Sequence, residues 1–276
     1  MTHSIKTQGH GEQSRTMKAK KSLGQNFLKS VKAISVIVEA GNIISEDIIL
    51  EIGPGKGVLT EKLLEKANKV VAVEKDRELV YLLKEKFKNE IEQKKLVLIK
   101  DDILEFKPES HGLTAGNYKI IANIPYYITG LIFRKFLESD CQPDLMVLLV
   151  QKEVAQRIVA KDGRESILSM SIKAYGSPKY ISKVSRKYFS PEPNVDSAIL
   201  LIQNISKKVF TENKISEKKF FELVKAGFSH KRKVLSSNLK FLFGSQTAQL
   251  LGECGIKEKA RAEELKLGDW LCLLKP

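Results

Sequence analysis

Residues 48–57 read Ile-Ile-Leu-Glu-Ile-Gly-Pro-Gly-Lys-Gly, and they give the clearest indication of the fold class. The segment IILEI is a short apolar run that ends at glycine, which is typical of a buried strand. The three glycines that follow allow a sharp turn and let a ligand approach the main chain closely. A helical pattern begins at Val58. The stretch therefore predicts a strand, turn and helix at the start of an α/β fold.

The same alternation continues along the chain. Strands are predicted at 69–74, 96–100, 118–123 and 145–151, and helices at 58–66, 77–88, 129–138 and from Glu153 onward. Apolar strands that alternate with helices of this length predict a parallel sheet covered on both faces. Two later strand candidates, Tyr180–Val184 and Ser197–Ile202, have no helix between them. We expect them to form an antiparallel hairpin at the edge of the sheet.

Composition divides the chain into three parts. Residues 1–16 are polar and show no periodicity, so we expect a disordered lead-in, and Met17 is an alternative start. Residues 17–205 hold the predicted sheet. Residues 206–276 show no strand pattern, and Lys207–Lys240 contains ten Lys or Arg against three Glu. This part is predicted to be a small, basic, helical domain, with Phe220, Phe221, Val224 and Phe228 as one buried stripe.

The charge balance points to a polyanionic partner. The chain has 47 Lys and Arg against 33 Asp and Glu, a net charge of +14. Such a surplus favours nucleic acid or an anionic membrane surface. The longest unbroken apolar run, Leu145–Val150, is far below the ~20 residues of a membrane-spanning helix. The first sixteen residues lack the apolar segment of a secretory signal, so we expect no membrane insertion and no export.

The three cysteines lie far apart. Cys141, Cys254 and Cys272 form no CxxC pair. The spacing predicts neither a zinc site nor a disulfide framework, and no other motif indicates a metal. We therefore expect a reduced, cytoplasmic protein.

Carboxylates follow the glycine turn at the ends of the next strands. The GxGxG spacing fits the dinucleotide fingerprint poorly, and no Gly-Lys-Ser/Thr follows, so neither a nicotinamide oxidoreductase nor a phosphate loop is indicated. Glu74, at the end of the second strand, can accept hydrogen bonds from both hydroxyls of a ribose. Asp102 ends the third strand and can accept one from an adenine amino group. Carboxyl ends of parallel strands share one edge, so Gly53, Gly55 and these carboxylates predict a nucleoside site there.

The fourth strand ends in Asn123-Ile124-Pro125-Tyr126. With the glycines, Glu74 and the Asp, this order resembles the S-adenosylmethionine-dependent adenine N6-methyltransferases. The adenine amine is a poor nucleophile because its lone pair is delocalised into the ring. The Asn123 side-chain oxygen and the carbonyl ahead of Pro125 can accept from its two N–H groups, and Tyr126 offers a face on which the base can stack. Catalysis is then largely positioning for in-line attack.

A second aromatic residue lies in the proline-stiffened stretch YFSPEPNVDS (residues 188–197). The target base must leave any stack to reach such a pocket. Phe189 is predicted to close on the face of the base opposite Tyr126.

Other motifs extend the resemblance to most of the chain. LGQNFL (23–28), NIPYYIT, YFSPEPNVDSA, FSHKRKVLSSNL (228–239) and RAEEL (261–265) resemble, in order, the rRNA adenine N6,N6-dimethyltransferases. The small-subunit branch is nearest, whose members dimethylate two adjacent adenosines in the 3′-terminal hairpin of 16S rRNA during ribosome biogenesis.

That resemblance implies a Rossmann-like methyltransferase fold with S-adenosylmethionine as cofactor and S-adenosylhomocysteine as product. It implies that the segment 23–28 folds over the cofactor, with Gln25, Asn26 and Leu28 in contact. It also implies that the C-terminal domain helps seat the enzyme on the immature small subunit. Because the sequence has no heptad repeat and no large apolar face, we expect a monomer. Lys231, Arg232 and Lys233 are the expected rRNA contacts.

Several other functions share parts of this pattern. Large-subunit rRNA methyltransferases of the antibiotic-resistance type share the catalytic motifs, and the segments KRK and RAEEL favour the small-subunit branch. A DNA adenine methyltransferase has no use for LGQNFL and the basic helical part. A non-catalytic assembly factor on the same fold predicts damage at Glu74, Asn123, Tyr126 or the glycines, and all are intact.

Overall fold

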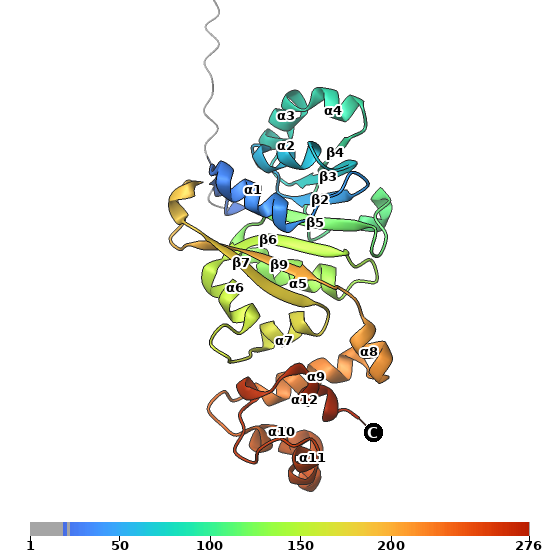
Figure 1. Cartoon of the computed structure of the whole chain (residues 1–276), viewed down its shortest axis with the longest axis vertical. Coiled ribbons are helices and arrows are strands. Elements are labelled where there is room, and N and C mark those ends of the chain that lie inside the picture. Colours follow the sequence, from blue (N-terminus) through green and yellow to red (C-terminus); the bar gives the residue numbers. More distant parts are fainter. Residues whose placement is uncertain (1–18, 21–22, 276) are drawn as a thin grey trace, which may run out of the picture.

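The computed structural model describes residues 19–20 and 23–275, which form a sheet domain with a group of helices at one end (Figure 1). The predicted lead-in (1–16) and the alternative start at Met17 lie outside the described residues. The main sheet has seven strands in the order β4-β3-β2-β5-β6-β9-β7. They are β2 (Ile48–Ile52), β3 (Lys69–Glu74), β4 (Leu96–Lys100), β5 (Tyr118–Asn123), β6 (Leu145–Gln151), β7 (Ser177–Val184) and β9 (Ser197–Gln203).

The first five of these strands are parallel, as the alternation of strands and helices predicts. Leu50 of β2 lies between Val71 of β3 and Ile120 of β5. β3 pairs in parallel with β4, and β5 with β6. The carboxyl ends of β2 to β5 therefore meet at one edge of the sheet.

The predicted hairpin is confirmed. β7 and β9 pair antiparallel, with a register shift between Tyr180 and Ser182, and β9 also pairs antiparallel with β6. β7 is thus the edge strand. It alternates exposed and half-buried residues, as expected of a strand at a sheet edge.

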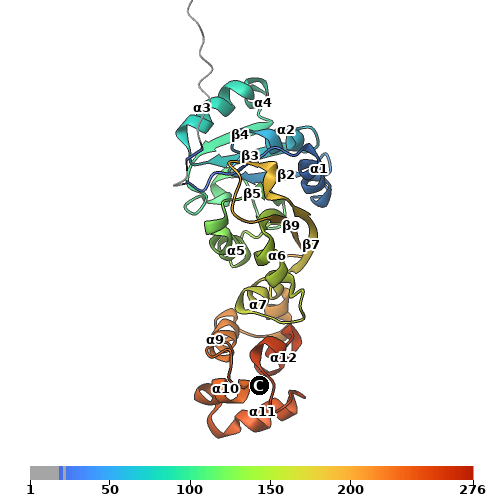
Figure 2. The same cartoon turned by 90° about the vertical axis from the view of Figure 1, so that its left-hand side faces the viewer.

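Helices cover both faces of the sheet. They are α1 (Val31–Ala40), α2 (Val58–Leu64), α3 (Arg77–Lys86), α4 (Lys88–Glu92), α5 (Thr129–Leu137), α6 (Lys152–Val159) and α7 (Ile167–Lys173). Successive strand residues point to opposite faces. Ile49 and Ile121 share a core cluster with residues of α1, α2 and α3, whereas Leu50 and Ile120 share one with residues of α5, α6 and α7. Figure 2 shows α5 and α6 on the side toward the C-terminal helices.

The chain after β9 is helical throughout the described residues. It forms α8 (Lys208–Asn213), α9 (Glu217–Gly227), α10 (Leu235–Phe243), α11 (Thr247–Glu253) and α12 (Leu267–Cys272). Of the predicted stripe, Phe220, Val224 and Phe228 are buried and Phe221 is half-buried. They pack into the same core cluster as one face of the sheet, together with the fully buried Trp270.

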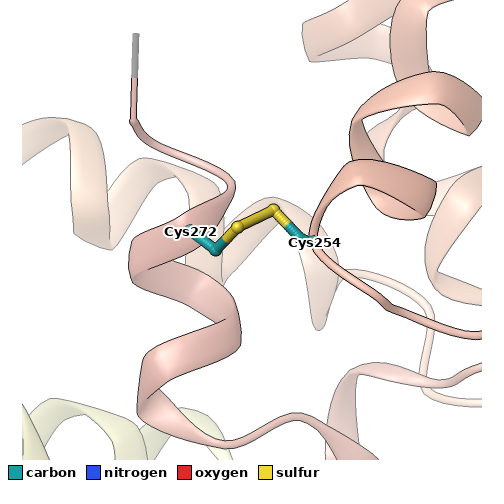
Figure 3. Close-up of a disulfide and its surroundings, with 2 residues drawn as sticks. All are labelled: Cys254 and Cys272. Atoms are coloured by element: carbon teal, nitrogen blue, oxygen red, sulfur yellow. A yellow bond between two sulfur atoms is a disulfide. The ribbon is translucent and has the colours of Figure 1, made fainter.

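The prediction that no cysteines pair is wrong. Cys254, just after α11, and Cys272, at the end of α12, form a disulfide with a Cα–Cα distance of 5.8 Å (Figure 3). Spacing along the chain could not reveal this pair, because the packing of α12 beside the end of α11 brings the two residues together. Cys141 is buried and free.

The sequence also predicts no membrane-spanning segment and no metal site. No helix there is both long and apolar enough to cross a membrane. No group of three His, Cys, Asp or Glu within 19–20 and 23–275 is arranged to hold a metal ion.

Gly57 supports a stability prediction. Its φ is +73°, and an added Cβ would lie 2.5 Å from the Phe87 ring and 2.8 Å from Leu83. We expect Gly57→Ala to lower the free energy of unfolding by about 1–2 kcal/mol for the left-handed backbone and by about 1–3 kcal/mol more for overpacking. Urea denaturation measures the change.

Gly112→Ala is the matched control. Gly112 has a φ of +75° but open space around its missing side chain. It should show the backbone cost without the packing cost. Equal losses in the two variants would contradict the packing argument.

Candidate active site

A cavity of about 500 Å³ lies at the carboxyl ends of β2, β3, β4 and β5. Residues from the loops after these four parallel strands line it, together with the segment 23–28. The predicted site residues that line it are Gln25, Asn26, Leu28, Gly53, Gly55, Glu74, Asp102, Asn123, Pro125 and Tyr126. The structure thus brings together residues that are up to a hundred positions apart in the sequence.

The glycines of the turn have different physical roles. All three have φ values between +60° and +73°, a conformation that favours glycine. An added Cβ at Gly55 would press on the Phe27 ring at 3.1 Å, whereas at Gly53 it would meet nothing within 4 Å. The main chain at Gly53 therefore borders open space in which a ligand can lie.

Glu74 links the turns that follow β2 and β3 through hydrogen bonds. Its carboxylate accepts hydrogen bonds from the backbone N–H of Gly55 at 3.1 Å and of Asp76 at 2.9 Å. Burial raises the pKa of Glu74 above its ordinary value, and these two N–H donors oppose that shift. A carboxylate has about four acceptor positions, so lone pairs remain for a ligand.

Glu51 is a site residue that sequence analysis did not single out. It is 1% exposed, lines the cavity, and its Oε2 has no hydrogen-bond partner among the described residues. Burial raises its pKa to about 8, with the neighbouring Glu74 charge adding to the shift. The sequence feature that could have identified Glu51 is its charge within the otherwise apolar strand IILEI. A buried carboxyl group with a free oxygen marks a place for a hydrogen-bond donor.

The segment 23–28 is held over the cavity by polar contacts. Gln25 Nε2 donates to Asp76 Oδ2 at 2.8 Å, and Lys20 Nζ contacts Asp76 Oδ1 at 2.7 Å. Burial pushes the pKa of Asp76 up, but the bonds from Lys20 and Gln25 outweigh it and leave that pKa below its ordinary value. Phe27 and Leu28 form β1 (Phe27–Leu28), which pairs with β8 (Phe189–Ser190).

Asn123 is oriented by the same segment. Its Nδ2 donates to the backbone oxygen of Asn26 at 3.1 Å. With the amide nitrogen engaged, Oδ1 is the atom left to accept a hydrogen bond within the cavity. Tyr126 is anchored nearby through its hydroxyl, which lies 2.6 Å from Ser197 Oγ, and burial raises its pKa. Its neighbour Tyr127, not predicted as a site residue, also lines the cavity and is 62% exposed.

Asp102 lines the cavity, whereas its neighbour Asp101 does not. Lys75 Nζ donates to Asp102 Oδ2 at 2.7 Å, and the backbone N–H of Leu104 donates to Oδ1 at 3.0 Å. The bond from Lys75 lowers the pKa of Asp102. The group therefore stays an acceptor, although each oxygen already has one partner.

Phe189 is the one predicted residue of the base site that does not reach the cavity. It is 2% exposed and packs in the core with Leu28 and Val184. The adjacent Tyr188 is 48% exposed. Stacking by Phe189 would require its ring to leave this core, so that role stays a prediction.

The predicted RNA-contacting residues lie in the C-terminal part. Lys231, Arg232 and Lys233 are exposed in the turn between α9 and α10. Lys231 also lines a second, larger cavity of about 1280 Å³, where the sheet domain meets the C-terminal helices. The walls of that cavity carry both acidic and basic side chains, so its charge does not select a polyanion.

Glu51 leads to a pH prediction. Because its folded-state pKa is about 8 against an ordinary value of 4.5, the folded protein binds this proton more tightly than the unfolded chain does. Between these two pH values, the unfolding free energy of the wild type should fall relative to Glu51→Gln as the pH rises. The slope should be at most about 1.4 kcal/mol per pH unit.

Urea denaturation of both proteins at pH 5, 6, 7 and 8 measures the trend. Glu85→Gln, at an exposed position of α3, is the control. A constant difference between wild type and Glu51→Gln over this range would show that Glu51 does not titrate there.

Comparison with known proteins agrees with this geometry. Residues 16–275 match the family model described as ribosomal RNA adenine dimethylase. A Dehalococcoides mccartyi protein named ribosomal RNA small subunit methyltransferase A is 43% identical over 263 residues, covering 94% of this chain and 89% of that protein. A Fusobacterium nucleatum protein of the same name is 40% identical and covers 94% and 97% of the two chains.

Solved structures show the same fold. A dimethyladenosine transferase from Plasmodium falciparum superposes with a TM-score of 0.74 at 25% identity, over 90% of this chain and 96% of that one. The fold is that of Rossmann-like methyltransferases. The match covers nearly the whole length of the chain, and the chain therefore belongs to the ribosomal RNA adenine dimethylase family.

Proposed function

We propose that this protein transfers methyl groups from S-adenosylmethionine to N6 of two adjacent adenosines in the 3′-terminal hairpin of 16S rRNA, with a role in ribosome biogenesis. The observation that carries the proposal is the orientation of Asn123. Its amide nitrogen is held by Asn26, which leaves Oδ1 as an acceptor in a cavity bordered by carboxylates. An exocyclic amine has the N–H donor that such an acceptor needs.

The cavity fits the proposed cofactor. S-adenosylmethionine supplies an electrophilic methyl group on a sulfonium when it is bound. Glu74 would hold the ribose hydroxyls with its remaining lone pairs. Open space over Gly53 leaves room for the rest of the molecule, and the unpartnered Oε2 of Glu51 is free to form a hydrogen bond with it. Asp102 would accept from the adenine amino group, and Gln25, Asn26 and Leu28 would cover the site.

Asn123 would act on the target amine. Its Oδ1 and the carbonyl of Ile124 would accept from the two N–H groups and turn the nitrogen lone pair toward the methyl group. Held in this way, the amine would take the methyl group that the cofactor supplies as its carbon–sulfur bond breaks, and the amine proton would leave to solvent. Tyr126 would stack on the base. Because no strong base is needed, positioning carries most of the rate increase.

The proposed partner is the rRNA of the immature small subunit. The net charge of +14 and the exposed Lys231, Arg232 and Lys233 support a polyanionic partner. We propose that the protein is cytoplasmic. We also propose that it is a monomer, since the sequence has no heptad repeat that would favour a larger assembly.

Labelled S-adenosylmethionine tests the function directly. The purified protein would be incubated with unmethylated small subunits, large-subunit rRNA or duplex DNA, and the nucleosides analysed by mass spectrometry. Dimethyladenosine in the small-subunit reaction only is the expected result. Label in large-subunit rRNA would assign the protein to the other branch, and no label with cofactor still bound would favour a non-catalytic assembly factor.

Substitutions at Asn123 and at Glu74 should affect catalysis and cofactor binding differently. Asn123→Ala should lower kcat by about 100-fold or more, because the amine loses its orientation, and should leave cofactor affinity within a few-fold. Glu74→Ala should instead weaken cofactor binding by tenfold or more. Single-turnover kinetics and calorimetry provide the two readouts. Full activity of Asn123→Ala would refute the proposed role.

The three basic residues in the turn between α9 and α10 should contribute to the salt dependence of RNA binding. Changing Lys231, Arg232 and Lys233 to Gln should reduce the log–log slope by roughly 0.7–0.9 for each phosphate that the variant no longer neutralises. The matched control changes Lys84, Lys88 and Lys94, all exposed at the opposite end of the molecule, to Gln. An equal effect of both triple variants would mean that net charge, and not this turn, sets the slope.

A further inference from the structure

Phe241 stands out among the aromatic residues. The chain has 12 phenylalanines, and all the others are buried or half-buried, whereas Phe241 is 94% exposed. It lies in the last turn of α10. A single exposed hydrophobic side chain is common in proteins, so its surroundings decide what it means.

Helix geometry places Phe241 on the outer face of α10. The inner face carries Leu235, Asn238 and Leu239, which are buried. Ser237 and Phe241 are four residues apart and both exposed, so they share the outer face with the exposed residue between them, a lysine at 240. The ring therefore points away from the core of the C-terminal helices.

The sequence that leads up to this ring is cationic. No Asp or Glu occurs from Leu223 to Gly252, a segment with five Lys or Arg. The basic loop (Lys231–Lys233) lies directly before α10, and Lys240 lies beside Phe241. No ion pair joins the basic loop or Lys240 to any other residue that the structure describes.

The basic loop is held against the same helix. Asn238 Nδ2 donates to the backbone oxygens of Gly227 at 2.6 Å and of His230 at 3.2 Å. From Leu235, the first residue of α10 and two positions after Lys233, to Phe241 the helical rise is only about 9 Å. The loop and the ring can therefore contact one molecule.

We propose that Phe241 is a base-stacking anchor with which the C-terminal domain grips an unpaired base of the small-subunit rRNA. The free cations of the basic loop and Lys240 would hold the neighbouring phosphates. Cations that form no ion pair, beside an exposed aromatic ring, are the features of single-stranded RNA recognition. This inference rests on the proposed function and adds a specific contact outside the active site.

The test uses the full-length protein with Phe241→Ala, Phe241→Trp and, as a control, Tyr81→Ala. Tyr81 is another exposed aromatic residue (69%), on α3 of the sheet domain. Affinities would be measured for protein-free, unmethylated small-subunit rRNA and for unmethylated small subunits. Because Phe241 packs on nothing, the melting temperature should not change, which shows that the fold is intact.

Phe241→Ala should bind both rRNA and subunits at least fivefold more weakly, consistent with removal of one aromatic–base stack. Its salt slope should equal that of the wild type, since every cation that faces a phosphate is still present. Phe241→Trp should restore the affinity within about twofold, and RNA should quench the added indole. Tyr81→Ala should bind as the wild type does.

Three outcomes would overturn the proposal. Unchanged affinity of Phe241→Ala for both RNAs would show that the ring makes no contact. A weaker affinity for intact subunits only would assign the ring to a ribosomal protein. Wild-type binding to phosphatidylglycerol vesicles that Phe241→Ala abolishes, with RNA binding unchanged, would assign it to a lipid surface.

Failure of this inference can be told from failure of the proposed function. If the wild type dimethylates small subunits while Phe241→Ala binds equally well, only the anchor is refuted. If the wild type neither binds nor methylates small-subunit RNA, the proposed function fails and the anchor fails with it.

Discussion

The arrangement of the site depends on the buried carboxylate of Glu74. It accepts the backbone N–H of Gly55 from the turn after β2 and that of Asp76 from the turn after its own strand. Asp76 in turn binds Lys20 and Gln25 of the N-terminal segment. One group therefore connects the glycine turn, the end of β3 and the cover of the cavity. Parallel strands make this possible, because their carboxyl ends lie side by side at one edge.

The electrostatics of the cavity suit a ligand rich in N–H and O–H donors. Burying a carboxylate without partners is unfavourable. The three carboxyl groups of the cavity differ in the interactions that offset this penalty. Two backbone N–H groups support Glu74, and Lys75 supports Asp102. Glu51 keeps an unpartnered oxygen, and its pKa rises to about 8. Such incomplete satisfaction is expected at functional sites, where a ligand supplies the missing bonds.

The proposed division of labour follows the charge distribution. The sheet domain holds the carboxylate-lined cavity, and the C-terminal part carries the basic loop and Lys240, in a segment of the sequence without Asp or Glu. The two parts share one continuous hydrophobic core, so their relative position is fixed by packing. Trp270 lies against Gly227 in this core, and Asn238 binds the Gly227 oxygen, so the packing of α12 also supports the basic loop.

The amino-acid pattern alone was enough to predict the α/β class, the parallel strands with their edge hairpin, and the placing of Glu74 and Asn123 at strand ends. These follow from local periodicity and from the single direction in which a parallel strand can present its end. Three features became visible only in the folded chain: the direction in which the Asn123 amide faces, the burial of Phe189, and the pairing of Cys254 with Cys272. Each of these depends on contacts between segments distant in sequence, and packing sets such contacts in ways that no local pattern records.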